Sequence, residues 1–237
     1  MKKIIILLVL FASPITNAQG LTTFFTKTDT FLKKNVSNGK VDYQSIKNDP
    51  SSLNDILEIA SKIDLSKEST NTSKAFWINA YNLSLIKGIV AKYPVKAPTD
   101  IAGLFDKTTY TIAGKKYTLN DVENKMIREK YNDARIHFVL VCGAIGCPPI
   151  INAAYLPETL EEQLNKQTKI ALNNPNFIKA NSGSKKVALS QIFEWYKNDF
   201  ISKGKNEIDF INQYREDKID PTFKTSYYPY DWTLNKK

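Results

Sequence analysis

The residues with the greatest capacity for chemistry lie in one segment, RIHFVLVCGAIGCPP, at residues 135–149. It holds His137, which is the single histidine of the chain, and Cys142 and Cys147, which are its two cysteines. These residue types serve as general bases, nucleophiles, metal ligands or disulfide partners. If the protein is an enzyme, we expect its active site in this segment.

The spacing within the segment limits what these residues can do together. Residues 135–141 are rich in β-branched and aromatic side chains, which predicts a strand. On a strand, residues five positions apart lie roughly 16 Å from each other and face opposite sides. A local dyad of His137 and Cys142 would therefore need the chain to turn back. The two glycines that follow Cys142 allow a sharp turn, and that turn favours a disulfide between Cys142 and Cys147.

A partner for the imidazole could come from the helix expected just before the strand. Glu123 on that helix is our candidate, because a carboxylate bonded to one ring nitrogen fixes the tautomer and raises the basicity of the other. Further candidate binding residues are Asn79, Asn82, Arg128 and Arg135. The two asparagines lie on an otherwise apolar helix, where buried amides need partners. They could contact the backbone of the strand or line a pocket.

Each of these residues also has a structural explanation. A lone histidine on an apolar strand is often a hydrogen-bonded core residue, and Glu123 could be a solvated helix position. Two close cysteines in an exported chain most often form a structural disulfide. A zinc site needs three or four protein ligands, and here it would require a distant carboxylate beside His137 and the cysteines. We therefore expect no metal site and no cofactor.

The N-terminus is typical of a secretory signal peptide. Lys2 and Lys3 precede the apolar run 4–12, and the small residues at 16–18 form a cleavage site. The run is shorter than the roughly 20 residues that a membrane span needs. We expect a signal peptide at residues 1–18, a mature chain without a membrane span, and a periplasmic or secreted location.

The charge balance narrows the class of partner. The chain has 33 basic and 24 acidic residues, a formal net charge of +9, but its basic residues are scattered. A nucleic-acid footprint would gather them on one element, so we expect no nucleic-acid partner. A small molecule, a peptide or a cell-envelope component is the expected ligand, and the oligomeric state stays open.

Apolar periodicity predicts an α+β fold, with helices packed around a small, mainly antiparallel sheet. The helix at 74–92 is apolar around most of its circumference, so we expect it at the centre. Residues 19–237 are expected to form a single domain that ends in an ordered aromatic strap at 225–235. The other expected elements are helices near 21–32, 51–59, 119–127, 157–172, 191–200 and 206–215, and strands at 108–112, 116–118 and 186–189.

Several ordered motifs carry a family resemblance. The segments FWINAYN (Phe76–Asn82), RIHFVLVC and CPP (Cys147–Pro149) resemble the bacterial DUF547 family of uncharacterised proteins. The helix with Glu123 and Arg128 fits the same pattern, as do VALSQIFEWYKNDF (Val187–Phe200) and YPYDW farther on. The resemblance spans roughly residues 72–200. It implies an exported or envelope-associated protein and no known activity.

A more distant likeness is to papain-like and transglutaminase-like folds, in which a central helix precedes strands, one of them with a histidine. Such enzymes begin the central helix with the nucleophilic cysteine. This chain has Lys74 to Trp77 at that place and no cysteine. A thiol nucleophile would therefore have to be Cys142 or Cys147.

Three functions follow as hypotheses. The first is a thiol-dependent hydrolase or transferase of peptide or amide bonds, with Cys142 or Cys147 as nucleophile, His137 as base and Glu123 as the group that orients the base. The second is a non-catalytic envelope binding module with a disulfide-stabilised loop. The third is a redox-active protein, which the spacing disfavours because it is not CxxC.

Overall fold

The computed structural model describes residues 17–202 and 204–237. The predicted signal peptide, residues 1–18, lies outside the described residues except for Asn17 and Ala18, which begin the first helix. The described chain combines helices with three small sheets, which confirms the α+β class. No helix among the described residues is long and apolar enough to cross a membrane.

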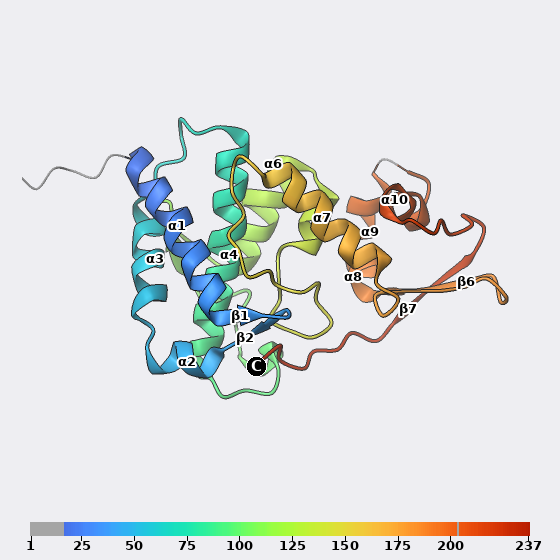
Figure 1. Ribbon diagram of the computed structural model, residues 1–237, viewed down its shortest axis with the longest axis horizontal. Helices are drawn as coiled ribbons and strands as arrows, with labels where there is room; N and C mark the ends of the chain where they lie inside the picture. The colour runs from blue at the N-terminus through green and yellow to red at the C-terminus, as the bar shows by residue number, and fades with distance from the viewer. Residues whose placement is uncertain (1–16, 203) are drawn as a thin grey trace, which may run out of the picture.

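The elements are labelled in chain order, as in Figure 1. The helices are α1 (Asn17–Asn35), α2 (Tyr43–Asn48), α3 (Ser51–Lys62), α4 (Thr70–Lys92), η1 (Pro98–Asp100), α5 (Leu119–Asp121), η2 (Val122–Arg128), α6 (Glu129–Tyr131), η3 (Ala134–Phe138), α7 (Leu160–Asn173), α8 (Gln191–Trp195), α9 (Lys197–Ile201) and α10 (Glu207–Tyr214). The strands are β1 (Val36–Ser37), β2 (Lys40–Val41), β3 (Tyr110–Ile112), β4 (Lys115–Tyr117), β5 (Ile178–Asn181), β6 (Lys186–Ser190) and β7 (Lys224–Tyr228).

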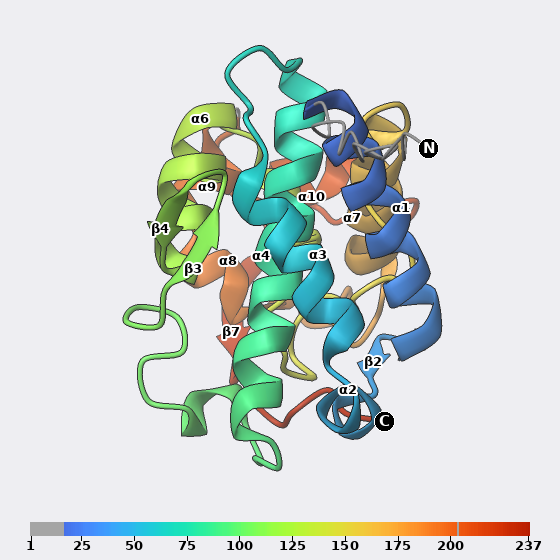
Figure 2. The same cartoon turned by 90° about the vertical axis from the view of Figure 1, so that its left-hand side faces the viewer.

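Helix α4 runs through the centre of the molecule, as its apolar circumference predicts. It packs against α2 and α3 on one side and against η2 on another, and Figure 2 shows it among these elements. Its start differs from the predicted one: the hydroxyl of Ser69 accepts a hydrogen bond from the Thr72 N–H and caps the helix there. The helix is therefore longer at its N-terminal end than the 74–92 predicted from sequence.

Buried apolar side chains form two clusters. The first includes α1, α3 and α4, and the second includes β6 and α8 to α10. In Figure 1 the elements of the first lie on the left and those of the second on the right. The short segment from Ile136 to Val139 contributes to both, because Ile136 and Val139 belong to the first cluster and Phe138 to the second. The histidine segment thus lies at the junction of the two cores.

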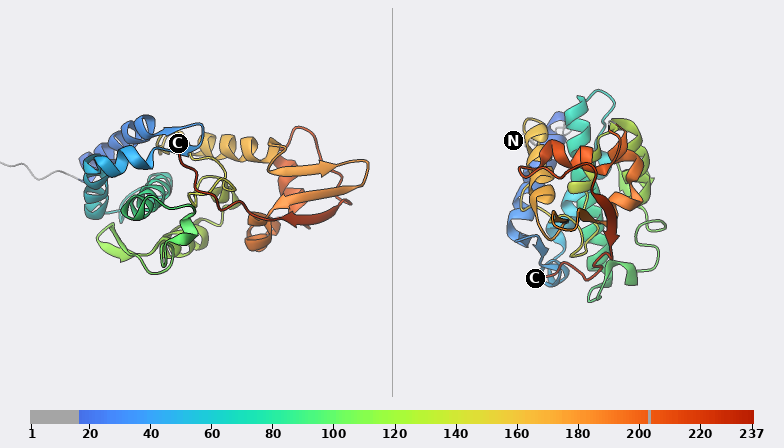
Figure 3. Two further views of the ribbon diagram at one scale, coloured as in Figure 1. Left: turned by 90° about the horizontal axis from the view of Figure 1, so that it is seen from below. Right: turned by 90° about the vertical axis from the view of Figure 1, so that its right-hand side faces the viewer.

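The C-terminal tail joins the two parts. Strand β7 pairs in parallel with β6, which pairs antiparallel with β5. Beyond β7 the chain runs back toward α2, as Figure 3 shows. Along this path the carbonyl of Thr233 accepts from the Ile145 N–H at 2.8 Å, and the Asn235 N–H donates to the carbonyl of Gly143 at 3.0 Å. The segment after β7, which includes the end of the predicted strap, therefore lies along the loop between the two cysteines.

The strand predicted at 135–141 is wrong. Ala134–Phe138 form the 3₁₀ helix η3, whose first turn is capped by Asp133, since its carboxylate accepts from the Arg135 N–H at 3.1 Å. Among the described residues no strand pairs with this segment. The strand preference of β-branched residues reflects packing against neighbouring strands. Without such a neighbour, the capping carboxylate determines the local structure.

Asp133 is also the centre of a buried charge cluster. It accepts hydrogen bonds from Lys74 and from Arg135, whose Nε and Nη2 lie 2.9 and 2.7 Å from its oxygens. Burial alone would raise the pKa of Asp133, but the hydrogen bonds from Arg135 and Lys74 hold it well below its ordinary value. Arg135 also pairs with Glu161 at 2.8 Å. This cluster fixes the start of η3 on α4.

We expect Trp77→Ala to lower the free energy of unfolding by about 3–5 kcal/mol, the range for large-to-small core changes. Trp77 is 2% exposed and packs edge-on against Phe76 and Tyr117. Trp77→Phe is the matched control and should cost less, because it keeps a ring and removes an indole N–H that has no acceptor among the described residues. Urea midpoints measure both. An unchanged midpoint for Trp77→Ala would show that α4 is not central.

Asp133→Asn should remove about 3 kcal/mol of stability at pH 7, because it leaves buried Lys74 without its counter-charge. The folded-state pKa of Asp133 lies below its unfolded value. Its contribution is therefore present above an unfolded pKa of about 3.9 and is lost as the pH falls through the lower folded value. Urea unfolding between pH 7 and pH 3 should show a shallower acid decline for the variant than for the wild type. Parallel curves would contradict this.

Candidate functional site

A pocket of about 360 Å³ lies where the two apolar clusters meet. His137, Glu123, Cys142 and Cys147 all line it. These residues come from η3, from η2 and from the loop after η3, so the fold brings together the four residues that the sequence singled out as catalytic candidates. Most of the remaining wall is aromatic and includes Tyr196, which lies just before α9.

His137 is held by Asp199 of α9, not by Glu123. The Nε2 atom of His137 lies 2.7 Å from Oδ2 of Asp199, and the imidazole side chain is only 3% exposed. Burial alone would raise the pKa of Asp199, but hydrogen bonds from His137 and Arg128 bring it well below its ordinary value. An ionised carboxylate can only accept, so Nε2 donates. Nδ1 is then the ring nitrogen left to take a proton.

Arg128 fixes the carboxylate that holds the imidazole. Its Nε and Nη2 lie 2.8 and 3.0 Å from the two oxygens of Asp199, a bidentate pair that sets the orientation of the carboxylate. The guanidinium also lies over the ring of Tyr196, 4.8 Å from its centroid, and that ring stacks on His137 with centroids 4.1 Å apart. The imidazole therefore has one ring face against Tyr196 and one nitrogen on Asp199.

Glu123 has tyrosines as partners. Its carboxylate lies 3.4 Å from the hydroxyl of Tyr81 and also hydrogen-bonds to the hydroxyl of Tyr196. Burial, and then the charge of Glu123, raise the pKa of both tyrosines, which keeps their hydroxyls protonated as donors. Glu123 lies on η2, a π-helical turn, and such turns often occur at functional sites. It supplies a negative charge to the pocket wall and does not orient the imidazole.

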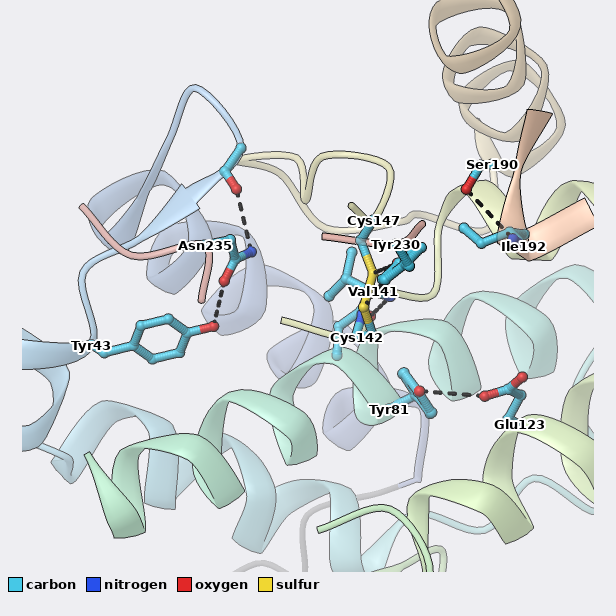
Figure 4. The surroundings of a disulfide bond; sticks show 12 residues. Tyr43, Tyr81, Glu123, Val141, Cys142, Cys147, Ser190, Ile192, Tyr230 and Asn235 are labelled. Atoms are coloured by element: carbon cyan, nitrogen blue, oxygen red, sulfur yellow. Dashed lines mark hydrogen bonds between the residues drawn. A yellow bond between two sulfur atoms is a disulfide. The ribbon is translucent and has the colours of Figure 1, made fainter. Parts of the chain in front are cut away.

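Cys142 and Cys147 form a disulfide, with Cα atoms 6.2 Å apart. The hydroxyl of Tyr230 lies 2.9 Å from Sγ of Cys147 and 3.1 Å from Sγ of Cys142. Figure 4 shows the tyrosine ring beside the sulfur atoms, with Tyr81 and Glu123 on the Cys142 side of the bond. The C-terminal strap thus places the Tyr230 hydroxyl against the disulfide. The loop is held by this contact as well as by its own disulfide bond.

The turn between the cysteines depends on one glycine. Gly143 has a φ of +78°, a conformation that favours glycine, and a Cβ there would lie 2.6 Å from Cδ1 of Ile89 on α4. The predicted glycine turn after Cys142 is therefore present, and it packs directly on the central helix. The Gly146 N–H donates to the carbonyl of Asp231 at 2.8 Å, which ties the second glycine of the loop to the strap.

The side chains of Asn79 and Asn82 hydrogen-bond to backbone groups of other segments. The Asn82 side chain bonds to the carbonyl of Val139 and the N–H of Val141, each at 3.0 Å. Asn79 does the same with Tyr155, donating at 2.7 Å and accepting at 3.0 Å. Each side-chain amide thus hydrogen-bonds to a backbone carbonyl and a backbone N–H of another segment, as a neighbouring strand would. Both side chains are buried, and neither lines the pocket.

The two arginines also make internal contacts. Arg128 holds Asp199, and Arg135 pairs with Asp133 and Glu161 outside the pocket. Among the described residues, no group of three or more His, Cys, Asp and Glu side chains is placed to hold a metal ion.

Sequence reasoning missed Asp199, Tyr196 and Tyr230. Asp199 is 62 residues from His137, and nothing local to the histidine points to it. One signal existed: Tyr196 and Asp199 are three residues apart in the motif EWYKNDF, which places them on one face of a helical turn. Tyr230 belongs to the motif YPYDW in the tail. From sequence, these two segments predicted a helix and an aromatic strap and carried the family resemblance, but they were given no role in the site.

Alkylation followed by mass measurement should find no free thiol in the native protein and two after reduction. The expectation rests on the pairing of Cys142 with Cys147. Denaturation without reductant is the control, and it should expose no thiol. Two thiols in the unreduced, denatured protein would contradict the pairing.

Of three comparisons with known proteins, one found a match, to a family model that covers part of the chain. No curated protein and no solved structure matches the chain. The family model described as "Protein of unknown function, DUF547" matches residues 65–170, which include α4, Glu123, His137 and both cysteines. Asp199 and Tyr230 lie beyond the matched range. The match supports the resemblance seen in the motifs: residues 65–170 of this chain are similar to the DUF547 family.

Proposed function

We propose that the pocket is the active site of a thiol-dependent hydrolase or transferase that acts on peptide or amide bonds. The observation that carries the proposal is the 2.7 Å contact between Asp199 and His137, because His137 lines the same pocket as both cysteines. A nucleophile needs a base, and the base needs a third group that orients it. Here the three are a cysteine, His137 and Asp199.

The disulfide makes reduction a precondition. With the sulfurs bonded to each other there is no thiol to attack a carbonyl, so the active form is the dithiol, made by a thiol reductant. After reduction, Nδ1 of His137 takes the proton of a cysteine thiol, and the thiolate attacks the carbonyl carbon of the substrate. The protonated imidazole then donates to the leaving amine, and water or an acceptor amine releases the acyl group.

Other groups of the pocket have supporting roles in this proposal. The hydroxyls of Tyr81 and Tyr196 donate their hydrogens to Glu123 and stay protonated, so their oxygens can accept a hydrogen bond from a polar group of the substrate. The aromatic walls suit an apolar side chain. Trp195 is 46% exposed, stacks on Trp232 with ring centroids 5.9 Å apart and lines the same pocket, which extends the apolar surface outward.

A cell-envelope location is part of the proposal and rests on the signal-peptide pattern of residues 1–18. The substrate would then be a peptide or amide-bearing component of the envelope. Mass measurement of the N-terminus of protein recovered from its native host tests the location. A chain starting at Gln19 is expected, and a chain retaining residues 1–18 in the cytoplasm would contradict it.

A non-catalytic binding module is the second candidate, and the disulfide itself favours it. With Cys142 and Cys147 bonded, the pocket still offers aromatic walls and the carboxylate of Glu123. The two candidates differ in their response to reduction. Binding by a module should be present in the oxidised protein, whereas amide cleavage should require the dithiol.

Asp199→Asn should slow amide or thioester turnover by the reduced protein by at least about 100-fold, the lower end for loss of general base catalysis. The Asn amide carries no charge, so it holds the donating Nε2 of His137 less firmly than the carboxylate does. Asp217→Asn is the matched control, because the only hydrogen bond of Asp217 that the structure shows uses its backbone carbonyl. The measurement is kcat/KM across a panel of amide and thioester substrates, with circular dichroism to check the fold.

His137→Gln should abolish the same turnover while the fold is retained. Turnover by folded His137→Gln at the wild-type rate would contradict the proposed base. Absence of turnover by the reduced wild type across the whole panel, together with ligand binding by the oxidised form, would favour the binding module instead.

A further inference from the structure

The two sulfur atoms of the disulfide have different surroundings. Sγ of Cys147 accepts two hydrogen bonds, from the backbone N–H of Cys142 at 2.9 Å and from the hydroxyl of Tyr230 at 2.9 Å. Sγ of Cys142 has one contact, at 3.1 Å to the same hydroxyl. Burial raises the pKa of Tyr230, so its phenol stays protonated and has one hydrogen to donate. Cys147 also has the backbone donor, and this asymmetry is a fixed property of the loop.

Hydrogen bonds to a charged form stabilise that form. A thiolate at Cys147 would find both donors already in place, whereas a thiolate at Cys142 would have at most the phenol. In thiol–disulfide exchange, attack on one sulfur expels the other as a thiolate, and the sulfur with the lower thiol pKa leaves faster. The surroundings therefore favour Cys147 as the leaving sulfur and Cys142 as the sulfur that is attacked.

We propose that this disulfide is a thiol–disulfide exchange site, at which a small uncharged thiol enters the aromatic pocket, attacks Sγ of Cys142 and expels Cys147. The thiolate of the attacking molecule forms a bond to Sγ of Cys142 as the bond between the two cysteines breaks. The electron pair of the broken bond goes to Sγ of Cys147. A second small thiol, also as its thiolate, attacks the sulfur of the first in the mixed disulfide and expels Cys142, so the two small thiols leave as a disulfide. The two protons that the small thiols lose to water are taken up by the sulfurs of Cys142 and Cys147, which gives the dithiol protein.

The pocket defines the class of thiol. Its wall is mostly apolar and its volume is about 360 Å³. The carboxylate of Glu123 lies on the Cys142 side of the disulfide (Figure 4), so anionic thiols are repelled from the sulfur that is attacked. Cys147 also borders a second pocket, of about 440 Å³. Because Cys147 lines both pockets, we take the direction of exchange to depend on the hydrogen-bond donors.

The first test uses the oxidised wild-type protein and 2-mercaptoethanol. Brief reaction, rapid alkylation of the freed thiol with N-ethylmaleimide and peptide sequencing by mass spectrometry locate both labels. Mercaptoethanol on Cys142 and maleimide on Cys147, in roughly tenfold excess over the reverse pattern, is the expected result. Equal labelling, or mercaptoethanol mainly on Cys147, would overturn the proposal, as would an absence of exchange under conditions that reduce a small model disulfide.

The second test measures the donors directly. Cys142→Ser leaves Cys147 as the only thiol and keeps the backbone N–H, and Cys147→Ser leaves only Cys142. The pH dependence of reaction with a dipyridyl disulfide gives the pKa of each thiol. We expect the pKa of Cys147 to be lower by about one unit, which is a tenfold difference in thiolate at neutral pH. Equal values, or a lower value for Cys142, would overturn the proposal.

Tyr230→Phe in the Cys142→Ser background should raise the pKa of Cys147, because it removes one of the two donors. Tyr228→Phe is the matched control, since the Tyr228 hydroxyl donates to backbone carbonyls of Asn176 and Phe177 instead. It should leave the thiol unchanged. An unchanged thiol pKa in folded Tyr230→Phe would show that the phenol does not stabilise the Cys147 thiolate.

These experiments involve no amide or thioester substrate, so they stand apart from the proposed hydrolase. Exchange with the expected direction and no amide turnover would leave the redox site intact and reject the hydrolase. Amide turnover without directional exchange would support the hydrolase and reject the redox site.

Discussion

The carboxylate of Asp199 is the contact on which the rest of the site depends. It belongs to α9, in the second core, and it binds Arg128 of η2 and His137 of η3 at the same time. One side chain thereby fixes the imidazole tautomer, the position of η2 and the approach of the two cores. Removing it would leave Arg128, with its side chain 27% exposed, and an almost fully buried imidazole without their shared acceptor. The position of the imidazole and the packing of the two cores therefore depend on one side chain.

The disulfide loop is positioned by a separate set of contacts. Gly143 lies against Ile89 of α4, and the strap bonds to the loop through backbone groups and through Tyr230. The last residues of the chain thus complete a pocket whose histidine lies on η3. This arrangement explains why the pocket sits at the junction of the two cores: the first provides η2 and α4, and the second provides α8, Tyr196 and the strap.

Local signals in the sequence predicted the local features well. The apolar circumference of α4 is a property of the helix itself, and it correctly predicted that this helix is central. The glycine turn after Cys142 is of the same kind. Features that depend on distant residues were missed or wrong. The segment 135–141 has strand-forming residues but no partner strand, and the acceptor for His137 comes from 62 residues away. Neither can be derived from spacing.

The central claim is that Asp199 holds His137 with the proton on Nε2 and leaves Nδ1 to act as base. Because the chain has one histidine, nitrogen-15 NMR of labelled protein gives one imidazole spectrum without assignment. In the neutral imidazole, long-range proton–nitrogen couplings distinguish the two tautomers. The account predicts a protonated Nε2 and an unprotonated Nδ1, with the preference lost in Asp199→Asn. A proton on Nδ1, or the same tautomer in Asp199→Asn, would contradict it.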